Sequence, residues 1–84
     1  MKTLHVVRKL DDPLPFELLN RKEERGEDTL LLIHDAVFHR GPLPQKAFAS
    51  APDIAARGIT SPLPTLTDEA ICQLIIEHDR IIVW

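Results

Sequence analysis

The first place where this sequence could do chemistry is a polar pair, His34 and Asp35, that directly follows the apolar run at residues 29–33. An unbroken apolar run indicates a strand covered on both faces, as in a parallel sheet. Reactive groups gather at the carboxyl ends of such strands. The pair could therefore orient a partner's thiol or stabilise a thiolate electrostatically. The alternative is that the imidazole satisfies a backbone carbonyl and Asp35 caps the next turn.

The single cysteine, Cys72, is the second chemical candidate. Sulfur transfer needs an exposed thiolate of low pKa. In a helix predicted over 67–78, Ile71, Leu74, Ile75 and His78 recur at helical spacing and should form its buried stripe. Cys72 lies beside that stripe, with no basic residue three or four positions away. We therefore expect Cys72 to be a buried or half-buried filler, with sulfur transfer as the alternative. One cysteine also excludes an intramolecular disulfide and a multi-thiolate zinc site.

Other polar and aromatic residues have simpler interpretations. Asp53 and Arg57 are four apart in a predicted short helix, a pairing worth ~0.2–0.5 kcal/mol. Trp84 is either a core plug or an interface anchor. His34, Asp35 and His39 could form a metal site, but their spacing does not place both imidazoles on one helix face, so no metal is predicted, and no other cofactor. We expect two further histidines, His5 and His78, at core edges.

The elements that must position these residues alternate along the chain. We predict strands over 3–8, 29–34, 46–50, 63–66 and 80–84, and helices over 13–25, 52–57 and 67–78, with a short helix from 36 that residues 41–44 stop. This order predicts a single domain over 1–84: an α/β fold, a small three-layer sandwich with a mostly parallel sheet of about five strands. The truncated second crossover leaves an apolar face thinly covered, which favours oligomerisation.

Composition excludes several functions. The chain has 84 residues, a net charge of −3 and no Tyr, which argues against direct nucleic-acid binding by a basic face or stacking platform. It shows no glycine-rich phosphate loop and no nucleophile elbow. Its first residues lack a signal-peptide core and no segment is long enough to span a membrane, so we expect a cytoplasmic protein without membrane contact.

Several short motifs occur in the order found in one known family. Leu4 and His5 lie in the first strand, and residues 30–37 (LLLIHDAV) are close to LLLIxDGV. Residues 47–49 and 53–59 (AFA, DIAARGI) are close to YAL…DLxARGI, and residues 77–84 (EHDRIIVW) are close to xHDRVLSW. The sequence thus resembles the DsrH/TusB family, the smallest member of the DsrE/DsrF/DsrH (TusD/TusC/TusB) sulfur-relay group.

The resemblance implies a small α/β subunit of a cytoplasmic sulfurtransferase complex. Its partners would be DsrE/TusD-like and DsrF/TusC-like subunits, with a DsrC/TusE-like acceptor. The pathway would be 2-thiolation of the tRNA wobble uridine or sulfur oxidation. Residues 9–20 lack the cysteine that some DsrH proteins carry there, which favours a structural or docking role over persulfide carriage. The resemblance also suggests a subunit contact at Asp53 and Arg57.

A second hypothesis needs no sulfur chemistry. In it the chain is a small homo-oligomeric binding module that uses the region of His34 and Asp35 to bind a ligand or a partner protein.

Overall fold

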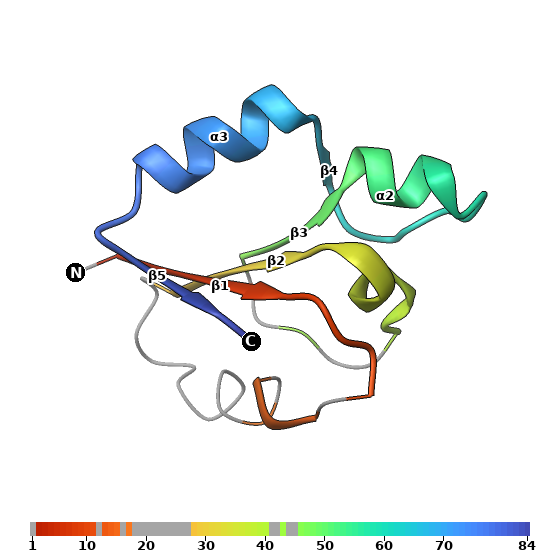
Figure 1. Ribbon diagram of the computed structural model, residues 1–84, viewed down its shortest axis with the longest axis horizontal. Helices are drawn as coiled ribbons and strands as arrows, with labels where there is room; N and C mark the ends of the chain where they lie inside the picture. Colours follow the sequence, from red (N-terminus) through yellow and green to blue (C-terminus); the bar gives the residue numbers. More distant parts are fainter. Residues whose placement is uncertain (1, 12, 16, 18–27, 41–42, 44–45) are drawn as a thin grey trace.

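A computed structural model places five parallel strands in one sheet (Figure 1). The structure describes residues 2–11, 13–15, 17, 28–40, 43 and 46–84. In spatial order the strands are β4 (Thr65–Leu66), β3 (Ala47–Ser50), β2 (Asp28–Leu32), β1 (Thr3–Val7) and β5 (Arg80–Val83). The predicted α/β fold is confirmed, and the sheet is wholly parallel.

The helical segments connect these strands. In the part of the chain that the structure describes, they include the 3₁₀ helix η1 (His34–Phe38) and the α-helices α2 (Ala51–Ala56) and α3 (Asp68–Ile76). The Thr67 hydroxyl accepts the Ala70 amide at 3.2 Å, so Thr67 caps α3 as its sequence position predicts. Most of the helix predicted over 13–25 lies outside the described residues. None of the helices in the described ranges is long and apolar enough to cross a membrane.

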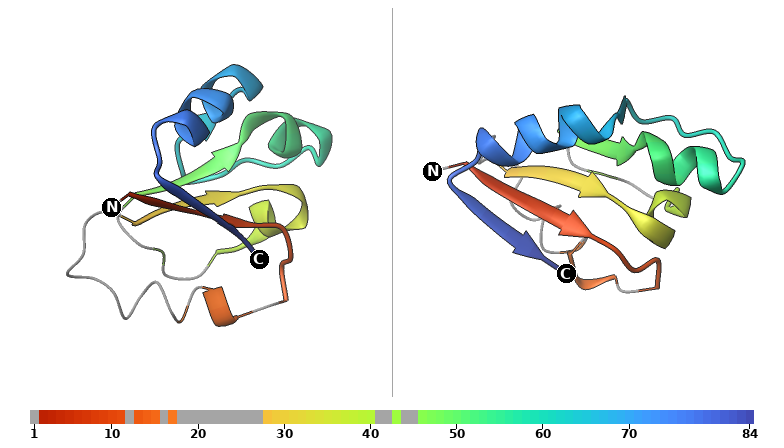
Figure 2. Two further views of the ribbon diagram at one scale, coloured as in Figure 1. Left: turned by 60° about the vertical axis from the view of Figure 1, so that its left-hand side comes forward. Right: turned by 45° about the horizontal axis from the view of Figure 1, so that its top comes forward.

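The central strand of the sheet is β2, as its apolar run predicts. Residues 29–32 are all buried, because helical segments cover both faces of the sheet. Leu32 packs in one core cluster with Val37 of η1. Leu31 belongs to a second cluster, and Leu74 of α3 packs against it. Figure 2 shows α3 lying across that side. The arrangement is a small three-layer α/β sandwich.

The buried stripe of α3 is narrower than predicted. Ile71 and Leu74 pack on the sheet, but Ile75 is 39% exposed. Successive helix residues are rotated by about 100°, so Ile75 lies at the margin of a face centred between Ile71 and Leu74. One face of the helix meets the sheet, and residues at its margin stay in contact with solvent. The prediction that Ile75 is buried is therefore wrong.

Candidate functional site

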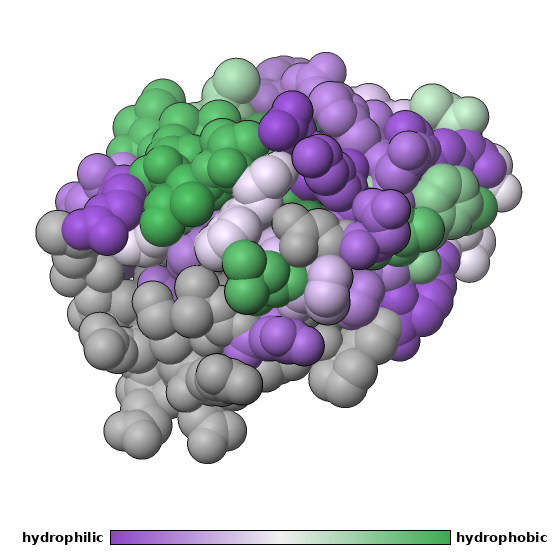
Figure 3. Space-filling view, turned by 60° about the horizontal axis from the view of Figure 1, so that its bottom comes forward, coloured by the Kyte–Doolittle hydropathy of each residue, from purple (hydrophilic) through white to green (hydrophobic). Residues whose placement is uncertain are grey.

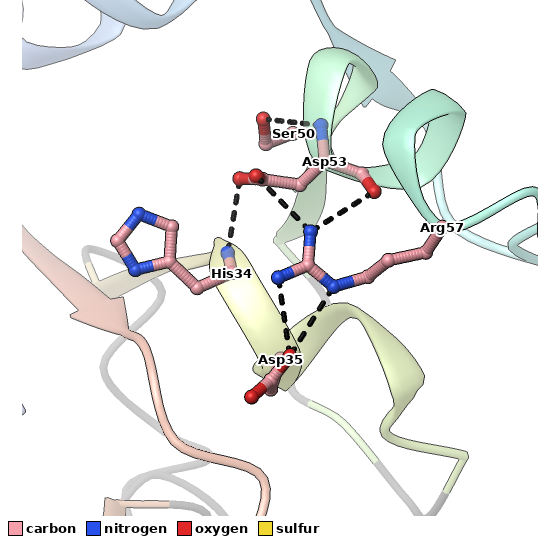
Figure 4. A network of polar contacts seen from close by, with 5 residues as sticks. All are labelled: His34, Asp35, Ser50, Asp53 and Arg57. Carbon is pink, nitrogen blue, oxygen red and sulfur yellow. Dashed lines mark hydrogen bonds and ion pairs between the residues drawn. The ribbon is translucent and has the colours of Figure 1, made fainter.

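A polar network lies at the carboxyl ends of β2 and β3. His34 and Asp35 begin η1 directly after β2, whereas Ser50 ends β3 and Asp53 and Arg57 follow in and after α2. Figure 4 shows these five side chains together. They meet because β2 and β3 are parallel neighbours, which places both carboxyl ends at one edge of the sheet. The predicted position of the pair at a strand end is confirmed.

His34 joins the network through its backbone. Its amide donates to Oδ2 of Asp53 at 2.9 Å, and its imidazole points away from the other members (Figure 4). Its φ of 51° lies in the left-handed region, which costs a non-glycine residue roughly 1–2 kcal/mol. The strand predicted to include His34 therefore ends at Leu32, because this conformation turns the chain into η1. The His34 imidazole is exposed and faces outward.

Arg57 connects the two carboxylates of the network. Its Nε and Nη2 donate to Oδ1 of Asp35 at 3.3 and 3.1 Å. Its Nη1 donates to Oδ1 of Asp53 at 3.4 Å and to the Asp53 carbonyl at 3.3 Å. The predicted helix pair of Asp53 and Arg57 is thus present. The sequence does not predict the bridge from Arg57 to Asp35, although both residues follow strands whose carboxyl ends meet at one edge.

The two carboxylates differ in environment. The Asp53 side chain is 23% exposed and that of Asp35 is 69% exposed. Burial raises the pKa of Asp53, but the His34 amide, the Ser50 hydroxyl and the charges of His34 and Arg57 together lower it by more, so the pKa lies below the ordinary value of 3.8. Asp53 is therefore ionised at neutral pH and acts as a structural anion. A pair as exposed as Asp35 and Arg57 contributes about 0–1 kcal/mol.

Most polar groups of the network are already engaged in structural contacts. Ser50 is buried, and its hydroxyl accepts the Asp53 amide at 3.4 Å as the cap of α2. Both oxygens of Asp53 already hold partners. The groups that remain at the surface are the His34 imidazole and the Asp35 carboxylate. A carboxylate and an imidazole on one rim can bind a partner through hydrogen bonds and charge.

An open hollow of about 540 Å³ borders the network at the carboxyl ends of β1 and β2. Its lining is Arg8, Lys9, Leu10, Asp11, Asp35 and Phe38. Asp35 belongs to both the hollow and the network, so a ligand in the hollow would meet a carboxylate that Arg57 holds in place. Cationic and anionic groups balance in this lining.

Cys72 lies elsewhere and differs from its prediction. It is on α3 and is exposed, so the expectation of a buried or half-buried filler is wrong. The cause is again the narrow buried stripe, because Cys72 is rotated by about 100° from Ile71 and clears the sheet. Cys72 is not one of the residues of the polar network. The thiol is therefore accessible to reagents and to partner proteins.

Trp84 and His5 pack against one another. The indole Nε1 donates to Nδ1 of His5 at 3.2 Å, and the two rings stack with centroids 6.2 Å apart. Trp84 also packs against the core cluster that contains Val7. These contacts support the interpretation of Trp84 as a core residue. Its role as an interface anchor stays a prediction. His5 is fully buried in β1 and lies deeper than the core edge predicted for it.

His78 lies at the core edge, as predicted. Its Nδ1 donates to the Leu74 carbonyl at 2.7 Å, and its Nε2 lies 2.9 Å from the Thr29 hydroxyl. A carbonyl can only accept, so the ring proton is on Nδ1 and Nε2 accepts from Thr29 in the neutral ring. Within the described ranges, no three His, Cys, Asp or Glu side chains are grouped as a metal ion would require.

Comparison with known proteins assigns no family to this chain. No protein-family model matches it, and no curated protein matches it.

Proposed function

We propose that this chain is a structural or docking subunit of a cytoplasmic sulfur-relay complex of the DsrH/TusB kind. Its partners would be DsrE/TusD-like and DsrF/TusC-like subunits, with a DsrC/TusE-like acceptor. The pathway would end in 2-thiolation of the tRNA wobble uridine or serve sulfur oxidation.

The observation that carries this proposal is the meeting of separate motifs in space. The motif at 30–37 supplies His34 and Asp35, and the motif at 53–59 supplies Asp53 and Arg57. The hydrogen bond from the His34 amide to Asp53 and the bridge from Arg57 to Asp35 join the two motifs. The two motifs resemble the same family and also contact one another. This contact supports the proposal that they form one structural unit.

Exposed apolar residues on α3 support a docking role. Ile75 and Ile76 lie three and four residues after the exposed Cys72, so they are its neighbours on the helix surface. Ile76 is 74% exposed. We name Cys72, Ile75 and Ile76 the α3 surface. Exposed branched side chains grouped on one helix are typical of protein interaction sites. The α3 surface is therefore our candidate contact for a partner subunit.

In this proposal the reacting cysteines belong to other subunits. An acceptor thiolate attacks the terminal sulfur of a partner's cysteine persulfide, a new sulfur–sulfur bond forms, the old one breaks, and the partner's cysteine leaves as a thiolate. Cys72 has Asp68, Glu69, Ile75 and Ile76 at the helical positions three and four away, so no basic group is placed there to favour its thiolate.

The test is co-expression with DsrE-like and DsrF-like chains from the same source. We expect one co-eluting particle by size-exclusion chromatography with light scattering. We also expect labelled sulfur to pass to the acceptor equally well with Cys72→Ser and with Gln73→Ser, an exposed neighbour on α3. Loss of transfer with Cys72→Ser alone would make this subunit a carrier. If the chains do not co-elute, the sulfur-relay proposal is contradicted.

The open hollow beside Asp35 favours the second candidate function, a homo-oligomeric binding module without sulfur chemistry. A screen of small ligands by thermal shift tests it. A ligand that stabilises the wild type but not Asp35→Asn would support this function.

A further inference from the structure

The strand β5 has an open edge with oriented backbone groups. The amides of Arg80 and Trp84 donate to the carbonyls of Lys2 and Val6 in and beside β1 at 3.1 and 2.8 Å. In a parallel pair, the N–H and C=O of one residue point to the same side, and successive residues alternate. The backbone groups of residues 81 and 83 therefore point away from β1. Among the described residues β5 pairs with β1 alone.

The side chains of β5 leave this edge apolar. In the register with β1, Ile81 lies beside Leu4 and Val83 beside Val6, on the face that α3 covers. Leu4 and Val6 are buried, but Ile81 and Val83 are 39% and 57% exposed, because α3 packs against the clusters of the inner strands. Figure 3 shows hydrophobic side chains gathered over this part of the surface.

The two edges of the sheet differ in protection. Exposed edges usually carry a Lys, a Pro, a bulge or only a very short strand, which prevents pairing with another chain. The β4 edge has two residues and follows Pro64. The strand β5 is longer than β4 and carries one charged residue, Arg80, at its start, but residues 81–83 are all branched and apolar. The β5 edge is therefore the less protected of the two edges of the sheet.

We propose that two copies of this chain pair through β5, antiparallel and about a two-fold axis at Ile82. Ile81 then lies opposite the partner's Val83, and the two five-stranded sheets become one continuous sheet. This inference concerns the chain by itself and does not depend on the sulfur-relay proposal.

The outward backbone groups select this register. Ile81 and Val83 form hydrogen-bonded pairs with the partner's Val83 and Ile81, and each pair exchanges two bonds. A shift that places Ile81 opposite the partner's Ile81 would set Val83 opposite the partner's Asp79. The Asp79 amide already donates to the Lys2 carbonyl at 2.8 Å. In the shifted register Val83 and the partner's Asp79 therefore cannot form a hydrogen-bonded pair, because the Asp79 amide points to β1.

Side chains and charges agree with the same register. Ile81 meets the partner's Val83 on the α3 face, and Ile82 meets its own copy on the other face. Arg80 lies opposite the partner's Trp84, where a guanidinium can stack on an indole. The two copies of Arg80 are at opposite ends of the pair. A parallel arrangement in register would place these like charges side by side.

Pairing of β5 with β5 gives a closed dimer. Pairing of β5 with the β4 edge of another copy would continue without end, but β4 offers two residues and a preceding proline. Of the two edges of the described sheet, the β5 edge alone has both the length and the apolar side chains to pair with β5. The occupant that fits is therefore the same strand of a second copy.

Cross-linking tests the register. In a Cys72→Ser background, Ile82→Cys places two thiols on the axis in a non-hydrogen-bonded pair with Cα atoms about 4.5 Å apart, within disulfide reach. We expect Ile82→Cys to form a covalent dimer at least about tenfold faster than Val83→Cys, because facing thiols have a high effective concentration. Val83 is more exposed than Ile82, so random collisions would favour the control. Equal or faster linking of Val83→Cys would overturn the proposal.

Light scattering on the unlinked chain tests the pairing itself. We expect the wild type at twice its 9.5 kDa chain mass. Val83→Lys should be monomeric, whereas Ile76→Lys, an equal change in charge on α3, should remain dimeric. Circular dichroism shows whether each variant is folded. A monomeric wild type, or a dimer that only Ile76→Lys disrupts, would contradict pairing through β5. These measurements need no partner subunits, so they fail independently of the sulfur-relay test.

Discussion

The His34 amide donates a hydrogen bond to the Asp53 carboxylate at 2.9 Å and thereby ties the turn after β2 to the first turn of α2. The donor is a backbone group, so the contact depends on the backbone conformation at His34 and on the side chain of Asp53. Arg57 extends the same contact to Asp35.

Replacing Asp53 should destabilise the fold. Asp53→Ala leaves the His34 amide without its carboxylate partner and removes the charge that Arg57 contacts, so we expect a loss of about 1–3 kcal/mol in the free energy of unfolding. Asp35→Ala, at a more exposed carboxylate, should lose less than about 1 kcal/mol. Urea denaturation measures both. Equal losses at the two positions would mean that Asp53 does not organise the turn.

The backbone at His34 should prefer glycine. Glycine adopts a φ of 51° without the steric cost that other residues meet. We expect His34→Gly to be more stable than His34→Ala by about 1 kcal/mol in urea denaturation, although glycine also loses more entropy on folding. If His34→Ala equals or exceeds His34→Gly in stability, the left-handed turn is not the native conformation in solution.

Asp53 should make the fold sensitive to acid. Its pKa in the folded protein lies below the ordinary 3.8, so the unfolded chain binds the proton more readily. The stabilisation is complete above the unfolded pKa and is lost as the pH falls through the folded pKa. The difference in unfolding free energy between wild type and Asp53→Asn should therefore be larger at neutral pH than near pH 3. Asp11→Asn, at an exposed position, controls for the removal of one negative charge. A difference that does not shrink in acid would contradict the lowered pKa.

The thiol of Cys72 should react in the native protein. It is exposed, so an aromatic disulfide reagent should titrate one thiol per chain without denaturant. Cys72→Ser should change the free energy of unfolding by less than about 0.5 kcal/mol, because no core contact is lost. Reaction that begins only in unfolding concentrations of urea would show that the thiol is covered.

Removing the indole donor of Trp84 should weaken the core beside β1. Trp84→Phe keeps an aromatic ring but leaves Nδ1 of the buried His5 without this donor, at a cost of about 1–3 kcal/mol. Trp84→Ala should cost more, since the stacking with His5 is also lost. Thermal unfolding followed by circular dichroism measures both. A neutral Trp84→Phe would limit the role of Trp84 to packing.

Local patterns in the sequence determined the elements of this protein. The apolar run at 29–33 needs both faces covered, which predicts a central parallel strand, and β2 is that strand. Thr67 before two acidic residues predicts the start of α3, and Gly58, with a φ of 61°, closes the segment after α2. These features depend on residues within a few positions of one another, so the sequence alone is sufficient to predict them.

Only the tertiary structure decided which of the candidate residues meet and which are exposed. Arg57 reaches Asp35 because β2 and β3 are neighbours in the sheet, and local sequence does not specify strand order. Cys72 and Ile75 are exposed because α3 contacts the sheet through a narrow stripe, and the width of that contact depends on the strands beneath it. Periodicity predicts which residues share a helix face, but the neighbouring layer determines how much of that face is covered.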